Sequence, residues 1–385
     1  MDSPKAVSNS PTVSVIIATY NQAQYVSEAI RSVLGQTYSE FELIVVDDGS
    51  TDETPLILAG IQDPRMRVIW QPNAGLSAAR NTGLRESSAP LVSFLDSDDY
   101  FLPDKLEVLS GFLEDHSDIG LVAGRARYFD RIGNTIPGPG IVPTQLSLPN
   151  LLFRNPICVS GILMKRIWLE RVGVFDETLR ACEDWDLWLR LLARGCQMAA
   201  VEHYVVAYRI HPGQMTSQSE RMRKAILSML DKFFNQPDLP VSLSLTRNEA
   251  YASGLIHAGV YAYISSELDS GPRYLSDAIR LDPTLKYRGY KRLVAKLVSW
   301  ANDPRAGESI GFLQRIASNP PPGQPGLKRQ LRRAMADMYL GSFFSSSREN
   351  WRANRRDLFK VILYKPDWLL NRGVLRILVD AWFPI

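Results

Sequence analysis

Three carboxylates within four positions, Asp96, Asp98 and Asp99, are the side chains of this sequence best placed to do chemistry. They follow the apolar run L-V-S-F-L at 91–95, which is typical of a short buried strand. Carboxylates this close repel one another, so we expect a cation to share their site. Oxygen ligands at a strand end suit Mg²⁺ or Mn²⁺. A plain acidic turn, with Asp98 or Asp99 as a helix N-cap, explains this segment equally well.

Upstream of these acids, strand patterns alternate with helix patterns. The predicted strands are 13–18, 41–46, 66–70 and 91–95, and the first predicted helix is 24–34, where apolar residues recur at helical spacing. Alternation at this spacing predicts βαβ units. The fold class is therefore α/β, with a mostly parallel, Rossmann-like sheet flanked by helices.

Polar residues follow the predicted strands at their C-terminal ends. They form the clusters 19–21, 47–52, 73–77 and 96–99. In open α/β sheets ligands bind outside the carboxyl ends of the strands. We therefore expect Tyr20, Asp48, Arg80 and the acids at 96–99 to converge on one rim of the sheet.

Four segments together resemble glycosyltransferase family 2. They are V-S-V-I-I-A-T-Y-N (13–21), F-E-L-I-V-V-D-D-G-S-T-D (41–52), N-A-G-L-S-A-A-R-N-T-G (73–83) and F-L-D-S-D-D (94–99). The resemblance covers about residues 12–235. It implies the GT-A fold and an inverting transferase that takes a sugar from a nucleotide-diphosphate donor. A divalent ion, Mg²⁺ or Mn²⁺, would stabilise the departing diphosphate.

The same resemblance implies which residues bind the donor and the metal. The implied donor-site residues are Thr19, Tyr20, Asp48, Asn73, Gly75, Arg80, Asp96 and Asp98. Tyr20 and Asp48 would hold the base and ribose, with Asp48 accepting from a pyrimidine ring N–H, and Arg80 would lie near the diphosphate. Asp98 and Asp99 would bind the metal as part of the family's DxD region.

A catalytic base is expected later in the chain. Residues 183–186 read E-D-W-D and open a helical apolar pattern, and they resemble a family segment in which Asp184 would deprotonate the acceptor hydroxyl. The alternative is that Asp184 is only a helix N-cap, with the acids here favoured by the helix dipole. We interpret Asp184 as the base and Asp186 as structural. His211, in Y-R-I-H (208–211), resembles a family position near the metal or diphosphate, although a packed loop histidine is the alternative.

Charge and composition differ between the two halves of the chain. Residues 1–235 hold 22 Lys and Arg against 28 Asp and Glu, whereas residues 236–385 hold 22 against 13. The basic second half suggests a negatively charged neighbour, phospholipid rather than nucleic acid, since no nucleic-acid motif is present. Three cysteines without metal-ligand spacing are expected to be reduced, as in a cytoplasmic protein. No run of eighteen apolar residues predicts a membrane span.

The expected organisation is a disordered leader at 1–11 that is not a signal peptide, a GT-A domain at 12–235 and an all-α domain at 236–385. Two helical hairpins, at 247–280 and 332–364, loosely resemble tetratricopeptide units, with a linker at 301–326. Pro and Gly at 129–152 predict a mobile loop. Segments 290–300 and 374–385 pair apolar faces with basic residues and tryptophan, which fits either a membrane surface or a packed helix.

The function expected from these features is an inverting glycosyltransferase with a UDP- or dTDP-linked donor. Its acceptor would be a glycan or lipid-linked hydroxyl in surface polysaccharide or glycolipid assembly, at the inner face of the plasma membrane. A non-catalytic scaffold whose helical domain binds a protein partner is the alternative. A nucleotidyltransferase is disfavoured because no Gly-rich loop follows the first strand.

Overall fold

A computed structural model describes residues 11–136, 146–211, 213–215, 218–237, 239–345 and 355–370. The chain divides into two compact units: residues 1–215 with 224–250, and residues 216–223 with 251–385. Residues 236–250 thus group with the first unit, whereas the sequence placed the boundary at 235. Most of the predicted leader and the segment 374–385 lie outside the described residues.

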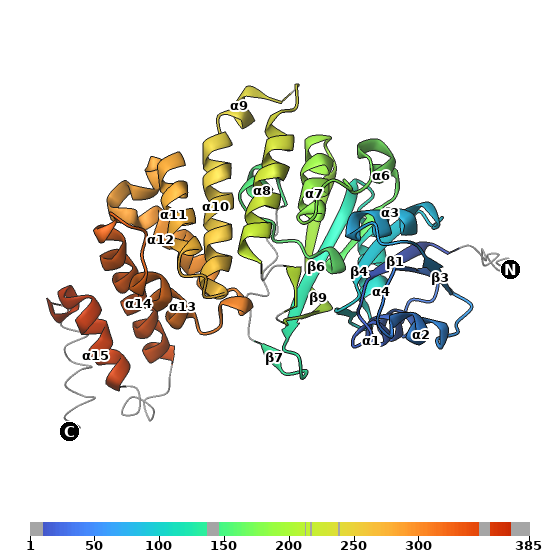
Figure 1. Cartoon of the computed structure of the whole chain (residues 1–385), viewed down its shortest axis with the longest axis horizontal. Coiled ribbons are helices and arrows are strands. Elements are labelled where there is room, and N and C mark those ends of the chain that lie inside the picture. The colour runs from blue at the N-terminus through green and yellow to red at the C-terminus, as the bar shows by residue number, and fades with distance from the viewer. Residues whose placement is uncertain are drawn as a thin grey trace. The chain divides into compact units, whose positions relative to one another are not determined.

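The first unit is built on one mixed sheet in the order β3-β2-β1-β4-β8-β6-β9-β5, with β7 paired to β6 (Figure 1). Its strands are β1 Val13–Thr19, β2 Phe41–Asp47, β3 Met66–Trp70, β4 Leu91–Asp96, β5 Tyr100–Phe101, β6 Ile119–Phe129, β7 Thr135–Ile136, β8 Ile162–Lys165 and β9 Gln197–Arg209. The parallel pairing of β3, β2, β1 and β4 confirms the predicted βαβ half. Beyond β4 the sheet is mixed, because β8 runs antiparallel to both β4 and β6.

Helices flank this sheet on both faces. The helices that begin before residue 245 are α1 Val26–Leu34, α2 Thr54–Ala59, α3 Leu76–Arg85, α4 Lys105–Asp115, α5 Leu148–Phe153, α6 Ile167–Val172, α7 Glu183–Ala193, α8 Ser219–Phe234 and α9 Val241–Ser244. All seven residues of β1 are buried, with side chains alternating between the two faces. Val13, Val15 and Ile17 pack in one core with apolar residues of α1 and α4. On the opposite face α3 lies so close that a Cβ at Gly83 would come 2.4 Å from Ile16.

Part of the predicted mobile loop at 129–152 is regular structure, so that prediction was wrong over those residues. The segment contains β7, which pairs with the end of β6, and most of α5, where Leu151 and Leu152 are buried. Residues 137–145 between them lie outside the described residues.

The second unit contains helices and, in its described residues, no strand. The helices are α10 Arg247–Ile264, α11 Ser270–Leu281, α12 Tyr287–Ala301, α13 Ser309–Ser318, α14 Pro325–Ser345 and α15 Arg355–Tyr364. The predicted linker at 301–326 was wrong, because α13 lies inside it. Phe312, Leu313 and Ile316 give α13 a buried apolar stripe, and only the Pro-rich segment 319–324 connects it to α14. Tetratricopeptide likeness stays a prediction.

The predicted amphipathic segment 290–300 forms most of α12. Its apolar residues Leu293, Val294, Leu297 and Trp300 are buried inside the unit. The structure therefore favours the packed-helix alternative for this segment, since its apolar face is not free to enter a membrane. No helix among the described residues is both long enough and apolar enough to cross a bilayer.

Candidate active site

Sheet register brings the predicted polar residues to one edge. Thr19 at the end of β1 is the register partner of Asp47 in β2, and Ala18 is the partner of Asp96 at the end of β4. The loops beyond these strand ends are joined as well, because the Asn21 side chain accepts from Thr51 N at 2.7 Å. The expected rim of polar residues is therefore present.

Asp48 organises the loop that precedes α3. Its carboxylate accepts hydrogen bonds from Gln71 Nε2 (2.7 Å), Ala74 N (2.9 Å) and Gly75 N (2.8 Å). Asn73 Nδ2 donates to the Asp48 carbonyl oxygen at 2.9 Å. Gly75 has a positive φ of 96°, a left-handed conformation that glycine adopts without strain. Asn73, Gly75 and Asp48 thus form one unit, and contact between Asp48 and a pyrimidine stays a prediction.

Two residues at the end of β1 differ in exposure. Tyr20 is 46% exposed, whereas Thr19 is buried and its Oγ1 has no hydrogen-bond partner among the described residues. A buried hydroxyl without a partner costs free energy unless a ligand or water completes its bonding. Both observations fit a binding surface at this rim.

Arg80 links the acid cluster at 96–99 to the helix that carries the candidate base. Its Nη2 donates to Asp96 Oδ1 and its Nη1 to Glu183 Oε1, each at 2.5 Å. The guanidinium is buried, and the two carboxylates raise its pKa, outweighing burial, which acts to lower it. Arg80 therefore fixes the end of β4 relative to the start of α7. Its predicted contact with the diphosphate stays a prediction.

Asp184 stands in the first turn of α7 with the environment of a general base. Burial, followed by the neighbouring Glu183 carboxylate, raises the pKa of Asp184 to about 7, although Arg80 acts in the opposite direction. Asp184 Oδ1 accepts from Trp185 N at 2.7 Å and Oδ2 from Asn155 Nδ2 at 3.2 Å. A carboxylate with a pKa near neutrality can accept a proton efficiently at physiological pH.

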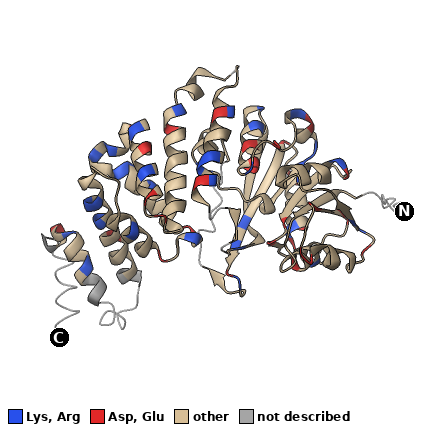
Figure 2. Cartoon of the chain, in the orientation of Figure 1, with Lys and Arg blue, Asp and Glu red and all other residues tan. Residues whose placement is uncertain are grey.

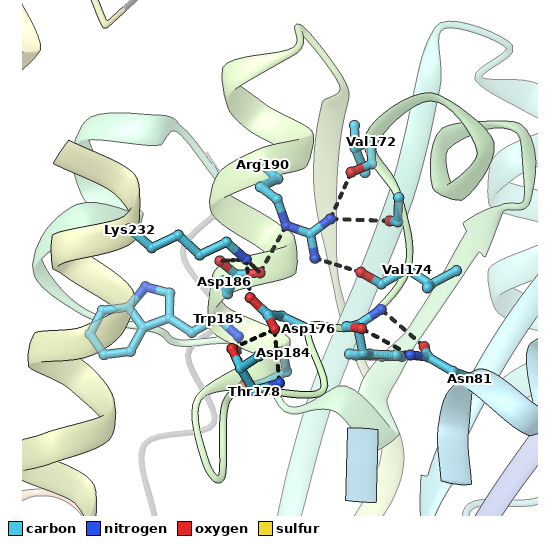
Figure 3. A network of polar contacts seen from close by, with 12 residues as sticks. Asn81, Val172, Val174, Asp176, Thr178, Asp184, Trp185, Asp186, Arg190 and Lys232 are labelled. Carbon is cyan, nitrogen blue, oxygen red and sulfur yellow. Dashed lines mark hydrogen bonds and ion pairs between the residues drawn. The ribbon is translucent and has the colours of Figure 1, made fainter. Parts of the chain in front are cut away.

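Asp186, two residues further on, is held in a different network (Figure 3). Arg190 Nε donates to it at 2.8 Å, and Lys232 Nζ of α8 at 3.0 Å. Lys232 also contacts Asp176 at 2.6 Å, and Arg190 donates to carbonyl oxygens at 172–174. These contacts support the structural role predicted for Asp186.

The neighbouring acids Asp98 and Asp99 lie in two different environments. Asp98 Oδ2 lies 3.0 Å from His211 Nε2 and is partly exposed. Asp99 is 2% exposed, and its two oxygens accept from Ser160 Oγ (2.9 Å) and Arg209 N (3.0 Å). Burial, then the nearby Asp98 and Asp96 carboxylates, raises the pKa of Asp99 well above its usual range. Asp98 and His211 are thus the better-placed metal pair, and ligation by Asp99 stays a prediction.

A buried polar network beneath these acids was missed by sequence reasoning. Lys105 is fully buried and donates to Ser160 O at 2.7 Å and Ser93 Oγ at 2.8 Å. Ser160 Oγ accepts from Asp96 N at 3.1 Å while it donates to Asp99. Burial lowers the pKa of Lys105 well below its ordinary value. Lys105 is the first residue of α4, six positions after Asp99, and no motif in the sequence marks it as part of the site.

Arg209 was also missed, although it precedes the singled-out His211 by two residues. Its Nε donates to the Asp98 carbonyl oxygen at 3.0 Å, and its guanidinium forms an ion pair with Glu28 of α1. Together with the Arg209 N–H bond to Asp99, these contacts tie the end of β9 to the acid cluster.

The residues present fit a divalent ion that is shared with a substrate. Among the described residues no group of three or more His, Cys, Asp or Glu side chains is arranged to hold a metal by itself. Mg²⁺ in phosphate-handling sites, however, is commonly held by one or two protein ligands plus substrate phosphates. The Asp98–His211 pair meets that requirement.

The architecture defines an α/β protein with the GT-A arrangement, and comparisons with known proteins agree. The profile described as Glycosyl transferase family 2 matches residues 14–173. An uncharacterized glycosyltransferase of Haemophilus influenzae is 30% identical over 243 residues, which cover 62% of this chain and 93% of the relative. The chain belongs to glycosyltransferase family 2.

Two further likenesses set the limits of the comparison. An uncharacterized glycosyltransferase of Rickettsia conorii is 30% identical over 219 residues, which are 55% of this chain but only 35% of that relative. The crystal structure of S. aureus TarS 1-349 in complex with UDP-GlcNAc superimposes with a TM-score of 0.52 at 18% identity, covering 93% of this chain and 92% of TarS 1-349. That likeness concerns the fold.

Proposed function

We propose that the protein is an inverting glycosyltransferase that moves a sugar from a nucleotide diphosphate to an acceptor hydroxyl. The observation that carries the proposal is the position of Asp184 next to Glu183, which Arg80 ties to Asp96 at the expected donor rim. Burial and the Glu183 carboxylate raise the pKa of Asp184 to about 7, which suits a general base. Family membership supports a nucleotide sugar as donor, and the structural neighbour TarS was solved with UDP-GlcNAc. We propose a UDP- or dTDP-linked sugar for this chain.

In this mechanism Asp184 accepts the proton of the acceptor hydroxyl as that oxygen attacks the anomeric carbon. The attack comes from the face opposite the nucleotide diphosphate, so the configuration at that carbon inverts. Asp98 and His211 would hold a Mg²⁺ or Mn²⁺ ion, which supplies Lewis-acid stabilisation of the diphosphate leaving group. Tyr20 and the loop that Asp48 orders would position the nucleotide.

The proposed cellular role is the assembly of surface polysaccharide or glycolipid from a glycan or lipid-linked acceptor. A peripheral position at the inner face of the plasma membrane fits the basic charge of residues 236–385. The alternative of a non-catalytic scaffold is disfavoured, because an inactive relic has no need to keep the acid cluster at 96–99 together with Asp184.

Donor hydrolysis tests this proposal without knowledge of the acceptor, since water can replace the acceptor hydroxyl. The protein is incubated with UDP- and dTDP-linked α-sugars and Mn²⁺, and the first-formed free sugar is observed by proton NMR before mutarotation. We expect the β-anomer to appear first. First appearance of the α-anomer would contradict inversion. The catalytic assignment would be contradicted if no hydrolysis occurred, or if hydrolysis did not depend on Asp184.

A further inference from the structure

The second unit contains two long stretches that carry cations and no acids. Residues 283–302 and 309–336 contain no Asp or Glu, and each stretch holds five Lys or Arg residues. Helices α12 and α14 fall largely within these stretches, and blue segments mark their Lys and Arg in Figure 2. A surface with one sign of charge creates a potential that attracts the opposite sign.

Six of these cations are exposed and have no acidic partner among the described residues. They are Lys286, Arg288, Lys291, Lys328, Arg329 and Arg332, here called the α12/α14 basic surface. Neighbouring cations differ: Arg292 lies 3.6 Å from Asp282, and Arg333 lies 2.8 Å from Asp367. The unit therefore neutralises some of its arginines and leaves this group uncompensated.

Local contacts bring the two halves of the α12/α14 basic surface together. A Cβ at Gly326 would lie 3.0 Å from the Tyr290 ring, and the Tyr290 hydroxyl is hydrogen-bonded to Gln324. Tyr290 is followed directly by Lys291. Since a helix rises 1.5 Å per residue, Lys328, Arg329 and Arg332 lie within about 9 Å of Gly326 along α14.

Stability does not account for the position of these cations. Lys328 and Arg329 lie near the start of α14, and cations near a helix N-terminus oppose the helix dipole. Arg288 and Tyr290 hold left-handed backbone conformations, with φ of 49° and 71°, which non-glycine residues adopt only at a cost. Both the cations near the start of α14 and the left-handed backbone at Arg288 and Tyr290 cost stability. Features that cost stability in this way favour a binding role for this surface.

One exposed aromatic residue favours a membrane over a soluble polyanion. Tyr287 is 65% exposed and the Arg288 guanidinium lies 5.4 Å from its ring centroid. Tyrosine is enriched at the level of lipid headgroups, because its ring is apolar and its hydroxyl is polar. The apolar face of α12 is buried, so the contact would be electrostatic at the headgroups rather than an insertion.

We propose that the α12/α14 basic surface binds the phosphate headgroups of an anionic phospholipid membrane. This contact does not depend on the transfer reaction, since none of the six residues belongs to the candidate active site. It gives the basic second half of the chain a defined binding surface and would hold the protein beside lipid-linked substrates.

Vesicle flotation tests the proposal with the full chain. Vesicles of phosphatidylcholine alone are compared with vesicles containing 30 mol% phosphatidylglycerol, at about 0.1 M salt, where the Debye length is about 10 Å. We expect binding only to the anionic vesicles and its loss in high salt. Combined Lys328→Gln, Arg329→Gln and Arg332→Gln should weaken partitioning roughly 100-fold, from the typical gain per cation near an anionic membrane.

A matched variant controls for the loss of three charges. Combined Arg31→Gln, Arg85→Gln and Arg194→Gln removes three exposed arginines from the first unit and should leave vesicle binding unchanged. Arg329→Lys with Arg332→Lys keeps the charge and should bind as the wild type does. Thermal melting should show no loss of folding in any variant.

Three outcomes would overturn the proposal. Equal binding to neutral and anionic vesicles would remove the electrostatic basis. Unchanged binding by the triple variant of α14 would place the contact elsewhere. Binding of soluble inorganic polyphosphate without any vesicle binding would make the ligand a soluble polyanion. Donor hydrolysis is measured in parallel, so that failure of the proposed function is recognised separately.

Discussion

The guanidinium of Arg80 and the carboxylate of Glu183 form a buried ion pair, with 2.5 Å between Nη1 and Oε1. These residues lie 103 positions apart in the sequence. Because Arg80 also binds Asp96, one side chain connects the acid cluster at the end of β4 with the helix that presents Asp184. The acid cluster at 96–99 and the candidate base Asp184 are thereby held in one arrangement.

Replacement of Arg80 by methionine should destabilise the fold. Loss of one partner leaves Asp96 and Glu183 without their buried counter-charge, which typically costs about 3–5 kcal/mol. Urea denaturation measures the free energy of unfolding. Arg85→Met, at the exposed end of the same helix, is the control and should change it by less than about 0.5 kcal/mol. Equal effects of the two substitutions would show that the buried pair has no special role.

Asp184→Asn should abolish transfer while leaving donor affinity unchanged. A general base typically contributes about 10²–10⁴-fold to the rate, and the amide cannot accept the proton. Release of nucleoside diphosphate measures the rate, and calorimetry measures donor binding. Asp186→Asn is the matched control on the same helix and should lower stability but retain activity. Full activity of the Asp184→Asn variant would refute the base assignment.

The pH dependence of kcat/KM should show an acid limb near pH 7. The base must be deprotonated, and the pKa of Asp184 is raised to about 7 by burial and by Glu183. Arg80→Met should move the limb to higher pH wherever the variant is still folded, since Arg80 lowers this pKa. A flat profile between pH 5 and 8 would count against Asp184.

Asp184 should make the free energy of unfolding fall as pH rises. A salt-bridged carboxylate, whose pKa is lowered by folding, has the opposite effect. Between the unfolded pKa near 4 and the folded value of about 7, the folded state binds more protons at Asp184 than the unfolded state does. Its contribution is therefore favourable at low pH and is lost as pH rises through this window. The melting temperature of Asp184→Asn minus that of the wild type should therefore be larger at pH 8 than at pH 5. A constant difference would contradict the raised pKa.

Lys105→Met should weaken the support beneath the acid cluster. The substitution removes donors to Ser160 O and Ser93 Oγ, and a buried group without a partner costs about 1–3 kcal/mol. Thermal melting of Lys105→Met against Lys165→Met, which loses one exposed bond to Ser117 O, measures the difference. Similar melting temperatures would mean that the buried network contributes little.

The N-terminal fold could be predicted because each local pattern agreed with its neighbours. The four parallel strands lie within one residue of the predicted ranges, since mainly apolar runs ended in polar or turn residues each time. The antiparallel strand β8 was not expected, because I-L-M-K is too short to show a periodicity. Helix α13 was missed because the neighbouring prolines and glycines suggested a linker.

Candidate site residues could be predicted where they belong to a sequence motif. They were missed where only the folded structure brings them to the site. Asp96, Asp98 and Asp184 stand in acidic segments that are visible in the sequence. Ser160 and Arg209 donate hydrogen bonds to Asp99 from segments far along the chain. No local sequence pattern therefore predicts their role. The buried pairing of Arg80 could not be read from its sequence neighbours, because its partners become adjacent only in the folded sheet.

The most direct test of the proposed function is a thermal-shift screen of nucleoside diphosphates, each with and without Mn²⁺. A ligand that binds only the folded state raises its stability by about 2.7 kcal/mol at 100 times Kd. We predict a metal-dependent rise in Tm with UDP or dTDP that disappears in Asp98→Asn. No shift with any nucleotide, with or without metal, would contradict the transferase assignment and favour the scaffold.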